Sequence, residues 1–311
     1  MITRKAPNPH GLEPAVPPGH LLATHLAGRE MSQAECARRC GRSAKLISEI
    51  VSGKAPIQPE TALQLERVLG LRSDVWLGIE SAYRLLLARR ADAAQAETER
   101  DWLASFPVGE LIERGMIEKR DSVAGTIDEL LAFFGVASIR AWRDWYGSLR
   151  IVIRPTRGAY IHEFALASWL RLGEIESGEI PCAEYSAVRF RKALTRLGAA
   201  ARRPKPGTWK LAQELCQAAG VALVKVEPLP RAPIAGTARW LTPRKALIQI
   251  GGGGRVPHRP WFMFFHEAAH LLLHSKKVVF VDPEGAVDAN GGGPADVEAQ
   301  ADAWAVGFPS H

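Results

Sequence analysis

The strongest chemical pattern in the sequence is an H-E-x-x-H motif formed by His266, Glu267 and His270, inside the apolar segment WFMFFHEAAHLLLH. Residues four apart lie on the same face of an α-helix, so both imidazoles can reach one metal ion. Glu267 projects beside them, where a carboxylate can act as a general base toward water. The segment therefore predicts a buried active-site helix that holds one Zn²⁺ per chain. The alternative is a buried histidine pair that binds no metal.

A hydrolytic zinc ion needs a third protein ligand and one open position. The expected third ligand is Glu298, which lies 28 residues after His270 in a second helical pattern over 296–305. Asp302 follows four residues later and so lies on the same helix face. We expect it to accept the free ring N–H of a ligand histidine and to fix the tautomer of that ring. Two histidines, a glutamate and an open position make the gluzincin arrangement, whereas His274 is expected only to form a hydrogen bond near the helix end.

A helix-turn-helix pattern occupies the N-terminal part of the chain, where SQAECARRCG is followed by RSAKLISEI. Ala34, Ala37 and Cys40 are predicted to place small side chains on one face of the second helix, which allows close packing against the next helix. Gly41 follows directly, at a point that needs a left-handed turn, and glycine adopts this conformation most readily.

Apolar residues are expected to anchor the third helix, so its polar and basic side chains point outward. Such side chains suit the base edges and phosphates of DNA. The predicted DNA-binding residues are Gln33, Arg42, Ser43, Lys45, Ser48 and Lys54. The alternative is an all-helical bundle whose basic face has no partner. Cys36 and Cys40 could share a metal, but no second Cys/His pair has zinc-finger spacing, so we interpret both as buried small hydrophobic residues.

Composition supports a nucleic-acid partner and excludes several classes of protein. The 311 residues carry a net charge of +7, and residues 1–90 contain 13 Lys and Arg against 8 Asp and Glu, whereas residues 91–311 contain 27 against 25. No run of about 18 apolar residues exists, which argues against a membrane span. The first 17 residues lack the apolar centre of a secretory signal. With four cysteines, a reducing, cytoplasmic location is expected.

The pattern along the chain predicts a multidomain protein. We expect a flexible arm at 1–18, an all-α helix-turn-helix bundle at 19–90, a helical connector at 91–149 and an α+β domain at 150–311. In the last domain, the strand predicted at 246–250 precedes the metal helix, and it could offer a sheet edge for a peptide substrate. A central position in the sheet would exclude that hypothesis.

Residues 19–84 resemble the XRE/Cro-type helix-turn-helix of HigA-like antitoxins. The resemblance is carried by SQAECARRCGRSAKLISEIVSGKAPIQPETALQLERVLG and the following VWLGIESAY. It implies a homodimer that binds a two-fold, palindromic DNA operator.

Residues from about 150 to 306 resemble the ImmA/IrrE family of zinc metallopeptidases. The matching segments are LCQAAGVALV, IAGTARWLTPRKALIQI, WFMFFHEAAHLLLHSKKVVFVD and E-x-x-A-D-x-W-A. The resemblance implies a zincin-like (gluzincin) domain that cuts a repressor under stress, with His266, His270 and Glu298 as ligands and Glu267 as general base. The chain departs from the family where Trp304 replaces a phenylalanine and the run that follows shortens to AVGFP.

Together these patterns predict a DNA-binding transcriptional regulator with a zinc-dependent endopeptidase domain. The expected protein substrate is a repressor or an antitoxin-type protein. The alternative is a HigA-like antitoxin or repressor whose peptidase-like domain is non-catalytic and serves sensing or structure. Metal content distinguishes the two interpretations.

Overall fold

The computed structural model describes residues 16–154, 160–251, 260–284 and 295–307. The arm expected at 1–18 lies outside these residues except for its last three. The chain divides into two compact units, Met1–Thr98 and Glu99–His311. The domain boundaries expected near residues 90 and 149 stay predictions.

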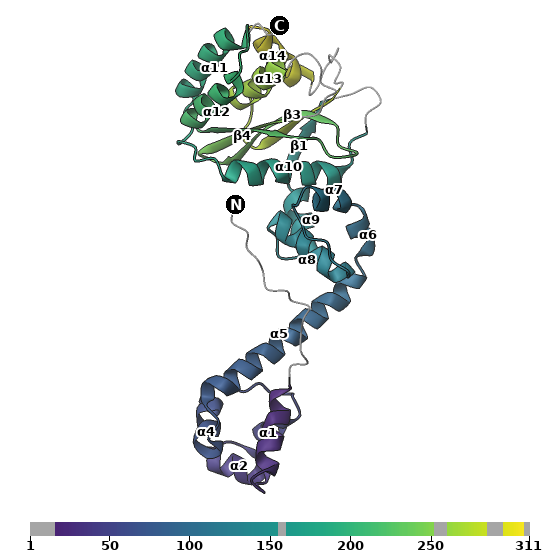
Figure 1. Ribbon diagram of the computed structural model, residues 1–311, viewed down its shortest axis with the longest axis vertical. Helices are drawn as coiled ribbons and strands as arrows, with labels where there is room; N and C mark the ends of the chain where they lie inside the picture. The colour runs from purple at the N-terminus through teal and green to yellow at the C-terminus, as the bar shows by residue number, and fades with distance from the viewer. Residues whose placement is uncertain (1–15, 155–159, 252–259, 285–294, 308–311) are drawn as a thin grey trace. The chain divides into compact units, whose positions relative to one another are not determined.

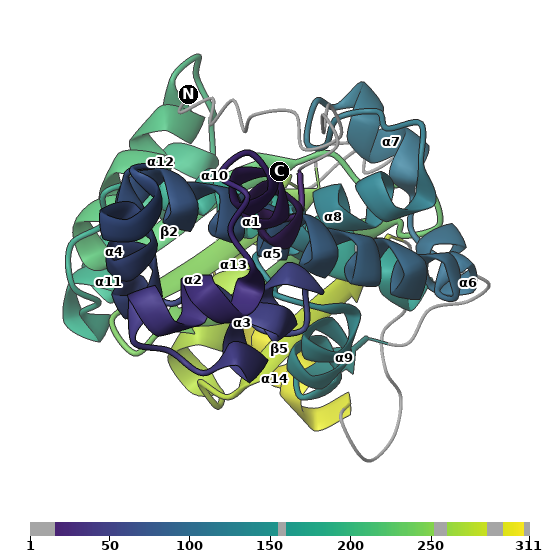
Figure 2. The ribbon, with the colours of Figure 1, turned by 90° about the horizontal axis from the view of Figure 1, so that it is seen from below.

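The first unit is an all-helical bundle (Figures 1 and 2). Its helices are α1 (Pro18–Ala27), α2 (Gln33–Cys40), α3 (Ala44–Val51), α4 (Pro59–Leu69) and α5 (Ser73–Glu97). The helices surround a core in which Trp76, Leu22, Ile47 and Leu65 are fully buried. The predicted helical bundle is therefore confirmed for this part of the chain.

Local hydrogen bonds define the turn between α2 and α3. The Ser32 hydroxyl accepts a hydrogen bond from the backbone N–H of Glu35 at 3.1 Å and so begins α2. Gly41 ends that helix with a left-handed backbone at φ 63°. The Ser43 hydroxyl then accepts from the N–H of Leu46 at 3.1 Å and begins α3. The predicted helix-turn-helix connection is confirmed in this detail.

The buried face of α2 differs from the predicted face by one residue. Cys36, Ala37 and Cys40 are buried as expected, but Ala34 is exposed. Positions 36, 37 and 40 share one helix face, whereas position 34 lies two residues before the first of them and turns away from it. The prediction for Ala34 was therefore wrong, although the small-residue packing face itself is present.

The backbones of α1 and α3 approach each other closely at Gly19, so a substitution there tests the packing of the bundle. A Cβ on Gly19 would overlap the backbone oxygens of Ile50 and Val51. Since a backbone cannot move aside cheaply, Gly19→Ala is expected to lower the free energy of unfolding of the first unit by about 1–3 kcal/mol. Hydrogen exchange of the α1 and α3 amides in the full chain measures this loss.

The control for this substitution is Gly78→Ala on an exposed part of α5, where an added Cβ meets nothing within 4 Å. It replaces the same residue type in a helix and is expected to stabilise the unit by about 0.5–1 kcal/mol. Equal protection of α1 and α3 in the two variants would contradict the close approach.

The second unit begins with short helices joined by aromatic packing. They are α6 (Arg100–Ala104), α7 (Val108–Glu113), α8 (Val123–Phe134) and α9 (Ile139–Gly147). Phe106 and Phe164 meet edge to face, with ring centroids 4.8 Å apart, and Trp142 stacks on Phe164 at 5.1 Å. Phe164 belongs to a helix of the α+β part, so this helical segment and the α+β part share one core.

A mixed five-stranded sheet forms the centre of the second unit. The strands are β1 (Arg150–Ile153), β2 (Val221–Val226), β3 (Ile234–Thr242), β4 (Lys245–Gly251) and β5 (Val278–Pro283). Their order is β1-β5-β3-β4-β2. β1 pairs with β5 and β2 with β4 in parallel, whereas β3 runs antiparallel to β4 and β5. The predicted α+β character is confirmed.

The position of β4 overturns the edge-strand hypothesis. A two-residue turn joins β3 to β4, with Thr242 opposite Lys245. The other side of β4 pairs with β2, where Ala246 lies opposite Val221. Because both sides of β4 are hydrogen-bonded, the strand at 246–250 cannot add a substrate peptide. The hypothesis was wrong because alternation of residues indicates a strand but not its neighbours.

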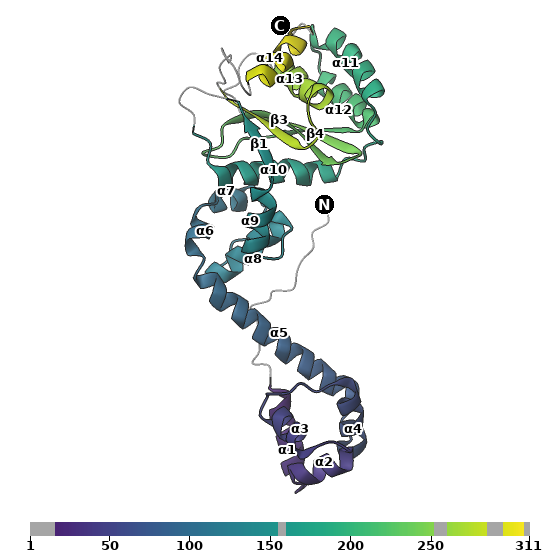
Figure 3. The same cartoon turned by 180° about the vertical axis from the view of Figure 1, so that it is seen from behind.

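Helices cover both faces of the sheet, with α10 on one face and the other four on the opposite face (Figures 1 and 3). They are α10 (Glu163–Gly178), α11 (Ala187–Ala201), α12 (Thr208–Ala219), α13 (Pro260–Leu273) and α14 (Ala295–Val306). The strands between these layers are largely buried, which explains their continuous apolar runs. Among the described residues, no helix is both long and apolar enough to cross a bilayer.

Candidate metal centre and DNA-binding helices

The two histidines of the motif lie side by side on α13. This helix is buried on almost every side, as its apolar sequence requires. His266 and His270 are 0% and 1% exposed, and their Nε2 atoms are 3.0 Å apart. Both ring nitrogens therefore point at the same small volume.

Helix α14 brings Glu298 to this volume. Its Oε2 lies 3.1 Å from the Nε2 of His266 and 3.4 Å from the Nε2 of His270. Glu298 is 2% exposed, so the carboxylate is directed into the protein by the packing of α14 against α13. The structure thus brings together all three residues that the sequence indicated as ligands.

Asp302 lies one turn beyond Glu298 and contacts the outer side of His266. Its Oδ1 is 2.9 Å from the Nδ1 of that ring. When Nδ1 carries the ring proton and donates a hydrogen bond to Asp302, Nε2 keeps a free lone pair that points toward Glu298. Arg154, which follows β1, pairs with Asp302 through two nitrogens, at 3.2 and 2.5 Å. The carboxylate is therefore fixed from both sides.

A fourth donor, Asp282, was not predicted from the sequence. It lies near the end of β5, is 0% exposed, and its Oδ2 is 3.2 Å from the Nε2 of His266. The donor atoms of His266, His270, Asp282 and Glu298 all lie within 4.8 Å of one another. The available signal was an acidic residue that ends an otherwise apolar strand, VVFVDP, 12 residues after His270.

Glu267 is buried beside the cluster, and its carboxylate oxygens have no hydrogen-bond partner among the described residues. A Cβ on Gly236 in β3 would overlap this carboxylate, so the glycine makes the space that Glu267 occupies. Burial and the nearby Asp282 carboxylate raise the pKa of Glu267 well above its usual range. An unpartnered carboxylate next to a cluster of metal-type donors has the position of a general base.

The electrostatics of the cluster favour a cation. Burial lowers the pKa of His266, but the carboxylates of Asp282, Asp302 and Glu298 outweigh it and raise the pKa to about 12. Burial raises the pKa of Glu298, but the two histidines outweigh it and lower the pKa to about 2. Carboxylates thus outnumber cations in a buried volume. Such an excess of negative charge is costly unless a cation compensates for it.

The separations between donors also fit a small cation. With Zn–N and Zn–O bonds of about 2.0–2.1 Å, the donors of a tetrahedral site stand about 3.3–3.4 Å apart. Four of the six separations within the cluster are 3.0, 3.1, 3.2 and 3.4 Å, and all six lie within 4.8 Å. Bonds of 2.3–2.6 Å to Ca²⁺ would require a wider arrangement and oxygen donors. The three donors of His266, His270 and Glu298 therefore fit a zinc-like ion.

His274 stands next to this cluster without belonging to it. Its Nδ1 is 2.9 Å from the Nδ1 of His270, on the side of that ring away from Glu298. This is the hydrogen bond expected near the end of the helix. His274 is absent from the four residues whose donor atoms converge.

The predicted DNA-binding residues lie on or beside α2 and α3. Exposed side chains are Gln33, Ser43, Lys45, Ser48 and Lys54. Arg42 is half-buried, and its Nε donates to the Oε1 of Gln64 at 2.7 Å. The hydroxyl oxygen of Ser43 caps α3, which leaves its proton to donate elsewhere. Lys45 is 83% exposed and lies 3.8 Å from Glu49, so its ammonium group is accessible to a phosphate.

Cys36 and Cys40 face the core of the first unit, with their sulfur atoms 4.0 Å apart. Burial raises the pKa of the Cys36 thiol to about 12. A metal binds the thiolate form, so this pair is poorly suited to be a metal site. The interpretation of both cysteines as buried small hydrophobic residues is confirmed.

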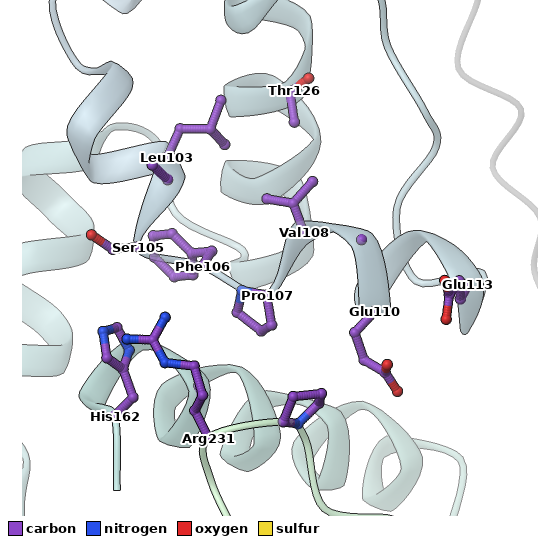
Figure 4. Close-up of a pocket in the computed structure, with 14 residues that line it drawn as sticks. Leu103, Ser105, Phe106, Pro107, Val108, Glu110, Glu113, Thr126, His162 and Arg231 are labelled. Carbon is purple, nitrogen blue, oxygen red and sulfur yellow. The ribbon is translucent and has the colours of Figure 1, made fainter. Parts of the chain in front are cut away.

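A separate pocket of about 610 Å³ lies in the second unit, between the α6–α8 segment and the start of α10 (Figure 4). His162 and Arg231 stand together on one wall, opposite Phe106 and Pro107. None of the residues that line this pocket belongs to the metal cluster. The two sites are therefore distinct.

The arrangement of α2, the turn at Gly41 and α3 within a helical bundle defines a helix-turn-helix protein. Over 73 residues the chain is 30% identical to the uncharacterized HTH-type transcriptional regulator YddM of Escherichia coli strain K12. The matched segment covers 24% of this chain and 78% of that relative. The chain belongs to the HTH-type transcriptional regulators through this N-terminal segment. No protein-family model matches the chain.

Solved structures that resemble the chain also match about a quarter of it. One is an addiction module antidote protein of the HigA family from Coxiella burnetii, with 27% identity, 27% of this chain and 94% of that chain covered, and a TM-score of 0.26. Another is the Pseudomonas aeruginosa antitoxin HigA with the higBA promoter, with 29% identity, the same two coverages and a TM-score of 0.26.

Proposed function

We propose that this protein is a DNA-binding transcriptional regulator with a zinc-dependent endopeptidase domain of ImmA/IrrE type. Its substrate class is a repressor or an antitoxin-type protein. The observation that carries the proposal is the buried convergence of His266, His270 and Glu298 beside the unpartnered carboxylate of Glu267. The enzymatic part is tested by incubating the full chain and Zn²⁺ with a quenched-fluorescent peptide library, while mass spectrometry follows the chain itself for self-cleavage.

Each residue of the site has a distinct part in the proposed reaction. His266, His270 and Glu298 would hold the ion. A bound zinc ion acts as a Lewis acid that polarises a carbonyl and acidifies water. Glu267 accepts a proton from the attacking water and passes it to the leaving amine.

Asp302 and Arg154 act through His266. Arg154 fixes the carboxylate of Asp302, and Asp302 holds the Nδ1 side of the imidazole, so Nε2 stays directed at the cluster. This chain of contacts joins β1, α14 and α13 at the site. We therefore assign Asp302 a positioning role.

The first unit supports DNA binding by α3. The apolar side of α3, with Ile47 and Ile50, lies in the core, and this leaves Lys45 and Ser48 on the exposed side of the helix. A helix held in this way presents short polar and basic groups to the major groove. The relationship to an HTH-type transcriptional regulator supports the same conclusion. A homodimer on a palindromic operator is the arrangement we propose, because helix-turn-helix dimers pair two such helices with two half-sites.

Removing two cations beside α3 tests this surface. The full chain with Arg42→Ala and Lys45→Ala is expected to bind duplex DNA of mixed sequence more weakly, because both side chains are predicted to contact phosphates. The slope of log affinity against log salt should fall by roughly 2, about one for each lost phosphate contact. Fluorescence anisotropy over a salt series measures both quantities.

Lys192→Ala combined with Arg196→Ala is the control, because it removes the same charge from exposed positions on α11. This control should retain the wild-type slope. An unchanged slope in the Arg42/Lys45 variant would contradict the assigned recognition helix, and metal content should be equal in all three proteins.

A second candidate function is supported by Asp282. Its Oδ2 lies 3.2 Å from the Nε2 of His266, and a fourth protein ligand would leave a tetrahedral ion no open position, which favours a metal-holding domain with no catalytic role. In that case the protein is a HigA-like antitoxin or repressor whose second unit serves sensing or structure. Zinc bound at one ion per chain without cleavage of the peptide library supports this second function.

A further inference from the structure

We infer that Asp282 is a fourth, displaceable metal ligand that closes the site in its resting state. This inference rests on the proposed metal site and adds a means of control to it. It concerns a residue outside the H-E-x-x-H motif and outside the third-ligand helix, since Asp282 comes from β5. The position that substrate needs is then occupied by a carboxylate of the protein itself.

The first argument is the environment of the Asp282 carboxylate. The residue is 0% exposed, and its closest polar contacts are the Nε2 of His266 at 3.2 Å and the Nη1 of Arg154 at 3.5 Å. An ionised carboxylate in such a place is costly unless a cation compensates for its charge. Asp302 differs in this respect, because its oxygens are satisfied by His266 and Arg154. Asp282 has only longer contacts, at 3.2 and 3.5 Å, so a bound metal ion would compensate its charge more fully than the protein does.

The second argument is geometric. The Oδ2 of Asp282 is 3.2 Å from the Nε2 of His266, close to the 3.1 Å that separates the Oε2 of Glu298 from that atom. Both spacings are close to the edge of a tetrahedron built on zinc-type bonds, about 3.3 Å. With four protein donors the coordination of a structural zinc is complete, whereas a catalytic zinc keeps one position for water or substrate.

Arg154 offers Asp282 a second partner. Its Nη1 is 3.5 Å from the Oδ1 of Asp282, and both side chains are almost fully buried. A carboxylate that turns away from the cluster therefore has a cation to receive it, so its charge stays compensated. Both contacts are present together in the structure, with Oδ2 toward His266 and Oδ1 toward Arg154. The site is closed while Oδ2 binds the metal, and it opens when Oδ2 leaves the metal and the carboxylate keeps only its contact with Arg154.

The test uses the full chain loaded with Co²⁺, whose visible absorption reports the number and type of ligands, and acetohydroxamate as a probe for an open position. Wild-type protein is expected to bind one Co²⁺ and to respond to acetohydroxamate only at markedly higher concentrations than Asp282→Asn needs, because the probe must first displace Asp282. Asp282→Asn keeps three ligands and should lose roughly 10–100-fold in Co²⁺ affinity. Its spectrum should then shift with acetohydroxamate and saturate.

Glu284→Gln is the matched control, because it removes a carboxylate two residues further along the chain and should behave as wild type. A wild-type spectrum that shifts with acetohydroxamate as readily as that of Asp282→Asn overturns the inference and leaves the proposed metal site standing. Wild-type protein that binds no Co²⁺ overturns the proposed metal site and the inference together. If Asp282→Asn fails to fold, the wild-type titration alone decides, and Asp282→Ala provides the second open-site variant.

Discussion

The full chain with His266→Ala is expected to retain less than about a tenth of the zinc that the wild-type protein binds, and Glu298→Ala is expected to do the same. Wild-type protein should contain about one Zn²⁺ per chain. His266 lies closest to the other donors, with its Nε2 within 3.2 Å of atoms of His270, Glu298 and Asp282. Its removal therefore leaves carboxylates that repel one another and one remaining imidazole.

Mass spectrometry of the metal content after dialysis against a zinc buffer measures this effect. His162→Ala is the control, since it removes a histidine of the same unit that lies outside the cluster. Zinc should also raise the unfolding temperature of wild-type protein, because a ligand that binds the native state stabilises it by about 2.7 kcal/mol at a hundred times its Kd. Wild-type protein that is metal-free after this dialysis would contradict the zinc assignment.

The unfolding temperature distinguishes the loss of a metal ligand from the loss of the fold. His266→Ala removes a buried side chain, so a change in unfolding temperature is expected even without metal. The zinc-dependent part of that temperature is the informative quantity. It should be present in wild type and His162→Ala, and absent from His266→Ala and Glu298→Ala.

Helical periodicity explains why most of the candidate site could be predicted from the sequence. His266 and His270 share a face by spacing alone, and so do Glu298 and Asp302. Only the contact between α13 and α14 could not be predicted from the residue spacing within a single helix. The known geometric demand of zinc, two histidines and one further ligand, supplied that step. The caps at Ser32 and Ser43 are equally local and were predictable in the same way.

Asp282 could not be predicted by this reasoning, because a strand brings it to the site. Its position depends on β5 lying between β1 and β3, with Gly236 opposite Asp282 in the register. Strand order is set by long-range pairing, and the residue pattern of a single strand does not encode it. The same limit produced the wrong edge position for the strand at 246–250.

The sequence also predicted only in part which residues of a correctly predicted helix are buried. The pattern of α2 indicated a buried face of small residues that includes Ala34, yet Ala34 is exposed. An alanine is compatible with either side of a helix, so the partner helices decide which side is covered. Small residues therefore define a packing face less sharply than Ile47 and Ile50 do on α3.

Glu267→Gln is expected to keep zinc at the wild-type level but to lose cleavage of the peptide library by about 10²- to 10⁴-fold. Glutamine has nearly the shape of glutamate, so it fits the space that Gly236 leaves, and no ligand is removed. It cannot accept a proton, however, and water would then attack without a general base. Initial rates over a range of peptide concentrations, with zinc content measured on the same samples, give the result.

Cleavage rate and zinc content, measured on the same samples, together test whether Glu267 is the general base. Glu284→Gln again provides the control, because it neutralises a carboxylate of the same unit that has no part in the proposed chemistry. Cleavage by Glu267→Gln at the wild-type rate would show that another group takes the proton. Loss of zinc together with activity would instead show that Glu267 supports the ligands. Retained zinc with lost cleavage fits one explanation only: the buried, unpartnered carboxylate of Glu267 handles the proton on which peptide hydrolysis depends.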